Sequence, residues 1–354
     1  MNGELITMKK TIRIIFIALL LIAGWFAWKF FGPATAFEGK SYYLHIRTGS
    51  GYQEVLATLQ KDGVLTSPGL FNTIAGRFGY PQKVKAGRYN IKSGMNLINI
   101  VRMLKNGQQE PVNLVITKLR TREDFASLVG RKFECDSAAF INYINNADSL
   151  KQYHLDSNTV MTSVFPDTYT YFWNTTPSKI FAKLRNGYET FWTTTRLSQA
   201  KEHGLNPQTA YTLASIVEEE TLKKEDKGKI ASVYLNRIAQ GMRLAADPTV
   251  KFALRDFGLK RIYDKHLAVE SPYNTYKITG LPPGPICTPS AQTIDAVITS
   301  PKTNYLYFVA KASLDGYSNF AATYEEHLKY AREYQQALDK LMLQKQPAND
   351  NLAH

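Results

Sequence analysis

The chain has 354 residues, of which 44% are hydrophobic, and this length is enough for two or three domains with buried cores. Its formal net charge of +13 suits anionic partners, but the basic residues are scattered and accompany no nucleic-acid motif, so we expect no nucleic-acid partner. The chain has only two cysteines, Cys135 and Cys287, which excludes a disulfide-built scaffold but leaves open whether the two pair with each other.

An apolar segment follows a basic N-terminus. Basic residues within residues 9–13 precede an uncharged run over Ile14–Trp28. Extending this run over residues 11–31 gives about the twenty residues that a membrane span requires. The positive-inside rule would keep residues 1–10 in the cytoplasm and place the rest of the chain outside. A cleaved signal peptide is the alternative, because the sequence Ala-Thr-Ala at residues 34–36 fits an A-x-A cleavage site.

A weak internal repeat follows a short tether at residues 33–41. The stretches Ile46-Arg-Thr-Gly and Ile91-Lys-Ser-Gly each begin a strand pattern that leads into a helical pattern of the same length. A third start of this kind lies at residues 114–116. The repeat predicts a small α+β packing module over residues 42–118.

Aromatic residues gather after a polar, helical stretch that ends near residue 160. The sequence Val-Phe-Pro-Asp-Thr-Tyr at residues 164–169 is followed by Tyr-Phe-Trp at residues 171–173. Aromatic faces suit the apolar C–H faces of sugar rings, but such clusters more often belong to a core, so both roles remain open. Residues 177–205 then predict one long helix, with aromatic and aliphatic side chains at helical spacing.

The most informative segment spans residues 206–221, with the sequence NPQTAYTLASIVEEET. Its Asn-Pro start suits the N-terminus of a helix. With a step of about 100° per residue and Leu213 set at zero, Glu220 falls at about 340°, inside the apolar stripe. Glu219 falls at about 240°, on the opposite and solvated face, and Glu218 at about 140°, at the edge of the stripe. Among these glutamates, only Glu220 is expected to face the core or a cleft.

A carboxyl group in an apolar stripe loses hydration, which raises its pKa and lets it hold a proton near neutral pH. Glu220 therefore has the property that a general acid needs. The alternative is a solvated helix end, on which Glu219–Lys223 and Glu220–Lys224 form i,i+4 ion pairs. The pattern of residues alone does not decide between these two interpretations.

The rest of the chain alternates helices with irregular segments. Residues 273–290 are rich in Gly, Pro and Thr and are expected to form a rigid loop outside the core interior, and long ordered loops usually carry function. The other expected elements are a helix over residues 230–238, a turn into a further helix at 243–250, a buried strand over 304–309 and a helix over 323–341.

Four sequence blocks resemble the YceG/MltG family of endolytic murein transglycosylases. They are FPDTY (165–169), LASIVEEET (213–221), ASVYLNRIAQGMRLAADPTV (231–250) and YNTYKITGLPPGPICTPS (273–290), in this order and with plausible spacing. In this family the catalytic glutamate stands immediately before a threonine, so the resemblance implies that Glu220 is catalytic.

The matching blocks also contain seven supporting or substrate-binding candidates, namely Glu218, Asn236, Arg237, Asp247, Tyr273, Asn274 and Tyr276. The chain departs from the family pattern at two positions. Ala245 stands where a glutamine is usual, and Ser318 stands where the family often has a histidine shortly before a phenylalanine. Any contact that those two family side chains make is therefore expected to be missing here.

The resemblance implies an α+β fold with a membrane anchor. Residues 11–31 would form a single inner-membrane span, residues 42–118 a LysM-like module, and residues 119–344 a mixed, helix-rich catalytic domain, followed by a polar tail over residues 345–354. A role of the LysM-like module in glycan contact is implied by the resemblance only. The family further implies cleavage within nascent peptidoglycan strands, near the peptidoglycan synthases, which ends glycan elongation.

One carboxyl group is enough for lytic transglycosylation, because the substrate supplies the nucleophile. Protonated Glu220 would protonate the oxygen between N-acetylmuramic acid and N-acetylglucosamine. Its carboxylate would then deprotonate the muramyl C6 hydroxyl, which closes on C1 to give a 1,6-anhydro end. Ordinary glycosidases need two carboxylates, and the sequence offers no convincing second one. No cofactor is expected, and no metal, because the six histidines are dispersed and no H-E-x-x-H motif occurs.

Two rival functions have less support. Ser198-Gln-Ala-Lys201 fits the S-x-x-K motif of penicillin-binding enzymes, but no S-D-N occurs, and the nearest K-T-G-like sequence, Lys92-Ser-Gly94, precedes the serine. A membrane-anchored, non-catalytic peptidoglycan-binding or scaffold protein would use the LysM-like module as its working part. That protein would not need Glu220.

Overall fold

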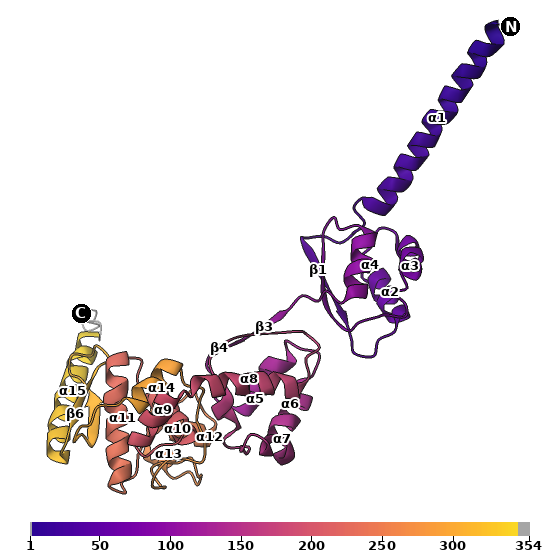
Figure 1. The fold of residues 1–354 in the computed structure, drawn as a ribbon. Helices are drawn as coiled ribbons and strands as arrows, with labels where there is room; N and C mark the ends of the chain where they lie inside the picture. The colour runs from indigo at the N-terminus through magenta and orange to yellow at the C-terminus, as the bar shows by residue number, and fades with distance from the viewer. Residues whose placement is uncertain (1, 346–354) are drawn as a thin grey trace, which may run out of the picture. The chain divides into compact units, whose positions relative to one another are not determined.

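The computed structural model describes residues 2–345, which combine many helices with small two-stranded sheets (Figure 1). The chain forms two compact units. The first comprises Met1–Asn113 with the short segments Lys132–Cys135 and Thr170–Thr176, and the second comprises Leu114–Arg131, Asp136–Tyr169 and Pro177–His354. The polar tail expected over residues 345–354 lies, apart from its first residue, outside the described residues.

The first unit begins with a long apolar helix, α1 (Asn2–Phe31). Within it, the stretch Lys10–Phe31 contains an 18-residue segment with a mean hydropathy of 2.2, and the described side chains of this segment are not buried. By length and composition this helix could cross a membrane, and a signal sequence would have the same properties.

The segment after α1 is not a free tether, contrary to the expectation for residues 33–41. Ala34 is only 3% exposed, and Thr35 forms a β-bridge with Leu65. The Ala34 amide donates to the Met95 carbonyl at 3.2 Å, and the Ala36 amide donates to the Val64 carbonyl at 2.9 Å. The expectation was wrong because these backbone groups find partners within the folded module instead of in water.

The module itself has the order strand, helix, helix, strand, helix. Strands β1 (Ser41–Ile46) and β2 (Gly87–Lys92) pair antiparallel, and the helices are α2 (Tyr52–Lys61), α3 (Pro68–Arg77) and α4 (Leu97–Asn106). The predicted repeat is found, because β1 leads into α2 and β2 leads into α4. Helix α3 was not predicted, although the Pro at its first position suits a helix start.

A second pair of strands, β3 (Val112–Ile116) and β4 (Asp167–Tyr171), contains the boundary between the two units. The third predicted strand–helix start is confirmed, since β3 leads into α5 (Arg122–Gly130), which Thr121 and Asp124 begin with a capping box. The elements α6 (Ser137–Asn145), α7 (Ala147–Lys151) and η1 (Val160–Ser163) follow.

The long helix expected over residues 177–205 is in fact two helices, α8 (Pro177–Phe191) and α9 (Thr194–Glu202). The break occurs at Thr193, whose backbone is extended and whose side chain accepts a hydrogen bond from the Arg196 amide. A threonine in this position caps a new helix, which overrides the continuous apolar spacing that suggested one helix.

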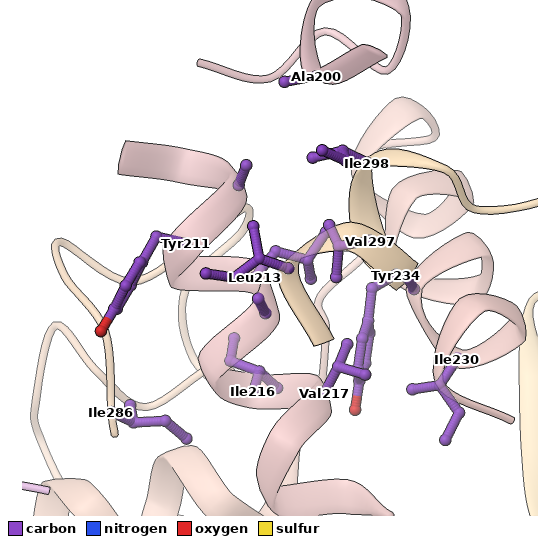
Figure 2. Close-up of a cluster of buried hydrophobic side chains, with 14 of the residues drawn as sticks. Ala200, Tyr211, Leu213, Ile216, Val217, Ile230, Tyr234, Ile286, Val297 and Ile298 are labelled. Atoms are coloured by element: carbon purple, nitrogen blue, oxygen red, sulfur yellow. The ribbon is translucent and has the colours of Figure 1, made fainter. Parts of the chain in front are cut away.

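The core of the second unit surrounds α10 (Pro207–Glu220). All eight residues from Ala210 to Val217 are buried, so this helix is buried all round and has no single apolar stripe. Figure 2 shows Leu213 and Val217 of α10 in this cluster together with Tyr234 of the following helix. The surrounding elements are α11 (Lys224–Ala239), α12 (Asp247–Leu254), α13 (Asp264–Leu267), α14 (Ala291–Ile298), β5 (Tyr307–Ala310), β6 (Ser318–Ala321) and α15 (Tyr324–Lys345).

The loop over residues 273–290 enters the core, contrary to expectation. Asn274, Ile286 and Cys287 are at most 2% exposed. The Ile286 amide donates to the Ser215 hydroxyl at 3.0 Å, and such side-chain partners let an irregular segment lie inside. The expected buried strand is also different, since β5 is only half-buried and pairs with β6 alone.

The aromatic cluster is divided between the core and the surface, since Phe165 is buried and Phe172 is 53% exposed. Phe165 is 7% exposed and packs against Tyr188, Phe191 and Tyr211 in the core of the second unit. This placement favours the core role for Phe165 over contact with a sugar. Within the described residues, Cys135 and Cys287 do not form a disulfide with each other.

Candidate active site

Three glutamates stand at the end of α10, where the helix stops. Thr221 has an extended backbone, with φ −147° and ψ 144°, so the helical spacing does not continue beyond Glu220. The i,i+4 pairs of a solvated helix end are therefore not formed, because Lys223 and Lys224 lie beyond the end of α10.

Glu218 forms a half-buried ion pair. Its carboxylate accepts hydrogen bonds from Lys227 at 2.8 Å, from Ser290 at 3.2 Å and from Thr293, and its side chain is 15% exposed. Burial acts to raise the pKa of Glu218, but the hydrogen bonds and the positive charge outweigh it and lower the pKa. Glu218 is therefore an ionised group that links α10 to α11 and α14.

Glu219 is also half-buried and paired, which corrects the expectation that it faces water. Its side chain is 17% exposed and lies 3.1 Å from Lys118 and 3.0 Å from Arg120. Burial acts to raise the pKa of Glu219, but the two cations and their hydrogen bonds lower it below its ordinary value. The expectation failed because α10 is covered on every side, so no face of it is solvated.

Glu220 has no ion-pair partner among the described residues, and this separates it from its two neighbours. It is half-buried, and its carboxyl group accepts a hydrogen bond from the Tyr234 hydroxyl at 2.7 Å. Burial raises the pKa of Glu220 to about 7, against a smaller lowering by the Tyr234 hydrogen bond. A carboxyl group with this pKa can both give and take a proton near neutral pH.

Asp247, the first residue of α12, supplies a second carboxylate near Glu220. The Tyr276 hydroxyl donates to Asp247 at 2.6 Å. The negative charge of Asp247 raises the pKa of Glu220 further, whereas the positive charges of Arg237 and Lys251 lower it. The site therefore gathers side chains from α10, α11, α12 and the loop that contains Tyr276.

Three of the remaining candidates hold the backbone around the site. Arg237 donates to the Leu306 carbonyl at 2.7 Å and to the Leu244 carbonyl at 2.6 Å. The Asn236 amide donates at 2.9 Å to two carbonyls of the segment before β5, those of Thr303 and Tyr305. The amide of Asn274, which is fully buried, donates to the carbonyls of Leu267 and Val269 at 2.9 and 2.8 Å. The side-chain NH₂ groups of both asparagines thus donate to backbone carbonyls of the protein itself.

Tyr273 and the two departures from the family pattern lie in different surroundings. Tyr273 lines a separate cavity, with its ring 4.6 Å from that of Phe252. Ala245 has a positive φ of 49°, and its amide donates to the Thr275 carbonyl at 3.1 Å. Ser318 lies in β6, where its amide donates to the Asp226 carboxylate at 2.7 Å.

Sequence reasoning missed Tyr234 and Lys251. Tyr234 lies in the ASVYLNR block, is 1% exposed, and donates its hydroxyl to Glu220. A tyrosine on a buried helix face needs a partner for its hydroxyl, which is the signal that could have pointed to it. Lys251 acts on Glu220 through its charge and had no comparable signal in the sequence.

The sequence model of the YceG-like family matches residues 44–333, which is more than half of the chain. A protein of Bacillus subtilis (strain 168) named endolytic murein transglycosylase is 28% identical over 306 residues, covering 82% of this chain and 84% of that protein. A protein of the same name from Streptococcus pneumoniae serotype 2 is 28% identical over 359 residues, covering 91% of this chain and 64% of that protein.

A solved structure has the same fold. The crystal structure of the yceG-like protein lmo1499 from Listeria monocytogenes superposes with a TM-score of 0.55 and 28% sequence identity. The match covers 82% of this chain and 98% of that one. Together with the family match, this shows that the chain belongs to the YceG-like family.

Proposed function

We propose that this chain is an endolytic murein transglycosylase in which Glu220 is both the general acid and the general base. The observation that carries the proposal is the difference among three adjacent glutamates. Glu218 and Glu219 are held ionised by cations, whereas burial raises the pKa of Glu220 to about 7. The relatives named endolytic murein transglycosylase support the same reaction.

The reaction needs one group that changes its protonation state twice. Protonated Glu220 gives its proton to the oxygen that links N-acetylmuramic acid to N-acetylglucosamine, and the C1–O bond breaks. The Glu220 carboxylate then takes the proton of the muramyl C6 hydroxyl as its oxygen bonds to C1, which leaves a 1,6-anhydro end and consumes no water. The Tyr234 hydroxyl stabilises the carboxylate form, and the charge of Asp247 favours the protonated form.

Hydrolysis is the second candidate, and the observation that favours it is Asp247. Glycosidases that use water have two carboxylates at the scissile bond, and Asp247 lies close enough for its charge to act on Glu220. Asp247 could then activate a water molecule while Glu220 acts as the acid.

Mass spectrometry of muropeptides released from purified peptidoglycan distinguishes these functions. We expect 1,6-anhydro ends from internal positions of the strands. Reducing ends without anhydro ends would show that the enzyme is a hydrolase. The absence of any cleavage, with binding retained, would indicate the non-catalytic scaffold protein.

For location, we propose that α1 is an uncleaved single-pass anchor in the inner membrane, with the N-terminus in the cytoplasm and the rest outside, near the peptidoglycan synthases. The buried Ala34 and the backbone hydrogen bonds of residues 34–36 support it, because cleavage after residue 36 would remove residues that pair with the folded module. Membrane fractionation and N-terminal sequencing test this proposal. A soluble protein that begins near Phe37 would contradict it.

We also propose that the module over residues 42–118 is LysM-like and helps to hold glycan. Its order of strand, two helices and strand supports this assignment. A deletion of residues 42–106 leaves β3 in place and should weaken binding to peptidoglycan sacculi while the second unit stays folded. Unchanged binding would make the module a spacer.

A further inference from the structure

The second unit contains a cavity of about 320 Å³ that is strongly basic. This volume lies at the lower end of the range for small-molecule sites. Three arginines line it, Arg120, Arg122 and Arg255, and no aspartate or glutamate is among the lining residues. A cavity with this composition attracts an anionic group.

The three guanidinium groups differ in how far their charge is already neutralised. Arg120 pairs with Glu219 at 3.0 Å. Arg255 lies 3.4 Å from Glu123, but both side chains are at least 50% exposed, so this pair is weak and easily exchanged. Arg122 bonds to the neutral amide oxygen of Asn145 and forms no ion pair within the described residues.

One wall of the cavity is aromatic and offers a hydroxyl donor. The rings of Tyr273 and Phe252 lie 4.6 Å apart. The Tyr273 hydroxyl has its partner, the Asn158 side chain, only at 3.5 Å, which is long for a hydrogen bond. Burial raises the pKa of Tyr273. The charges of Arg122 and Arg255, which line the same cavity, act in the opposite direction, and the negative charge of Asp156 acts with burial.

Helix α12 joins this cavity to the candidate active site. Asp247 and Lys251 on this helix act on Glu220, whereas Phe252 and the helix C-cap Arg255 line the cavity. With a rise of about 1.5 Å per residue, Phe252 and Arg255 lie about 8 and about 12 Å beyond Asp247 along the axis, and Lys251 lies between them and Asp247. The loop over residues 273–290 also contacts both places, because its Tyr276 donates to Asp247 and its Tyr273 lines the cavity.

We infer that this cavity, between Arg122, Arg255 and Tyr273, binds a carboxylate on the lactyl-peptide substituent of a muramic acid residue close to the bond at Glu220. The inference rests on the proposed function and adds a determinant of substrate choice to it. A carboxylate can accept a pair of hydrogen bonds from a guanidinium fork and a third from the tyrosine hydroxyl. Glycan strands carry such carboxylates on every peptide stem, and on the lactyl group itself where the stem has been removed.

Three substrates separate the sources of the carboxylate. They are glycan strands with intact stems, the same strands with all stem carboxylates amidated, and strands whose stems have been removed so that the lactyl carboxylate is free. We expect amidation to lower kcat/KM by about tenfold through KM, since one charge-assisted contact is lost. The lactyl group has no free carboxylate while a stem is attached, so a loss on amidation identifies a stem carboxylate as the ligand. Restored activity on the stem-free strands would show that the cavity also accepts the lactyl carboxylate, and activity that stays low would show that it accepts a stem carboxylate only. Equal kcat/KM on all three substrates would overturn the inference.

The variant Arg122→Gln, alone and combined with Arg255→Gln, tests the residues in the full-length protein. Each should lower kcat/KM on intact strands towards the value for amidated strands, and the loss on amidated strands should be clearly smaller. Arg332→Gln on α15 is the matched control, because this arginine is exposed and donates to the Leu328 carbonyl of its own helix. An equal loss on intact and amidated strands would mean that Arg122 is merely structural, and would refute the assignment.

Binding separates this inference from the proposed function. The Glu220→Gln chain is titrated calorimetrically with soluble disaccharide muropeptides, with free or amidated stem carboxylates. We expect amidation and Arg122→Gln each to weaken binding by about tenfold, even if the wild-type chain releases no anhydro ends. If the wild-type chain releases no anhydro ends but the Glu220→Gln chain still binds free-carboxylate muropeptides more tightly than amidated ones, the proposed function alone is refuted. If both kinds of muropeptide bind equally well, the role of the cavity alone is refuted.

Discussion

The surroundings of Glu219 and Glu220 show how one helix end can lower the pKa of one carboxyl group and raise the pKa of the next. Glu219 and Glu220 are adjacent and both half-buried. On one side Lys118 and Arg120 neutralise Glu219 and lower its pKa, and on the other side Glu220 has a tyrosine hydroxyl and a nearby carboxylate, and its pKa is about 7. The comparison teaches that burial raises the pKa of both carboxyl groups, and that the cations beside Glu219 overcome this effect there but not at Glu220.

The largest expected difference between substitutions at Glu219 and at Glu220 is in catalytic activity. Glu220→Gln keeps the shape of the side chain but cannot transfer a proton, so the rate should fall by about 10²–10⁴-fold or more. Glu219→Gln should keep activity within a few-fold of wild type once it is folded. Release of anhydro-muropeptides measures both, with circular dichroism as the folding control. An active Glu220→Gln beside an inactive, folded Glu219→Gln would reverse the assignment.

Glu220→Gln, which is expected to lower activity, should raise the stability of the folded chain near neutral pH. A pKa raised from 4.5 to about 7 means that the folded state binds the proton more tightly than the unfolded state. The contribution of Glu220 to stability is therefore full below pH 4.5 and is lost as the pH rises to 7, by about 3 kcal/mol at most. Glu220→Gln should gain stability relative to wild type between pH 5 and pH 8 in denaturant titrations. A difference that is constant with pH would show that the carboxyl group is not perturbed.

Glu219 should show the reverse pH dependence. Its folded-state pKa is lowered, so its contribution to stability is present above 4.5 and is lost as the pH falls below that value. Glu219→Gln should cost about 1–2 kcal/mol at pH 7, because Lys118 and Arg120 lose a half-buried partner. The cost should shrink at acidic pH, as measured by urea unfolding. The same cost at pH 3 and pH 7 would point to packing rather than charge.

The smallest expected effects are shifts in the pH profile of activity. Wild-type activity should fall as the pH rises through about 7, when Glu220 loses its proton. Asp247→Asn removes the charge that raises the pKa of Glu220, so the fall should move to lower pH. Tyr234→Phe removes the hydrogen bond that lowers this pKa, so the fall should move to higher pH. Shifts of the two variants in the same direction would contradict these roles.

Much of the fold could be predicted from the sequence because the patterns are local. The spacing of the repeat predicts β1, α2, β2 and α4, and the Asn-Pro start of residues 206–207 predicts the beginning of α10. The cap at Thr193 was missed although its partner, the Arg196 amide, is local, because the apolar spacing continues across it. Burial of the loop over residues 273–290 was missed because it depends on partners that only the folded chain supplies. Side-chain hydrogen bonds such as Ile286 to Ser215 are non-local and leave no pattern in the sequence.

The candidate site was found for a partly wrong reason. The helical wheel placed Glu220 in an apolar stripe and Glu219 in water, but α10 is buried all round. The cations that distinguish the two come from a segment about a hundred residues earlier, Lys118 and Arg120. No periodicity along α10 could reveal them, and Tyr234 and Asp247 likewise reach Glu220 only through tertiary packing.

The junction between α1 and the module acts as a joint with very few free torsions. The Gly32 amide donates to the Trp28 carbonyl at 2.8 Å, so Gly32 still belongs to the last helical turn, and Ala34 is already bonded to Met95 at 3.2 Å. Only Pro33 lies between them, and its ring fixes φ. A long flexible linker would let the module sample a wide region around the helix end. Here the module is obliged to follow the tilt and rotation of α1, so the orientation of the helix in its surroundings becomes the orientation of the module.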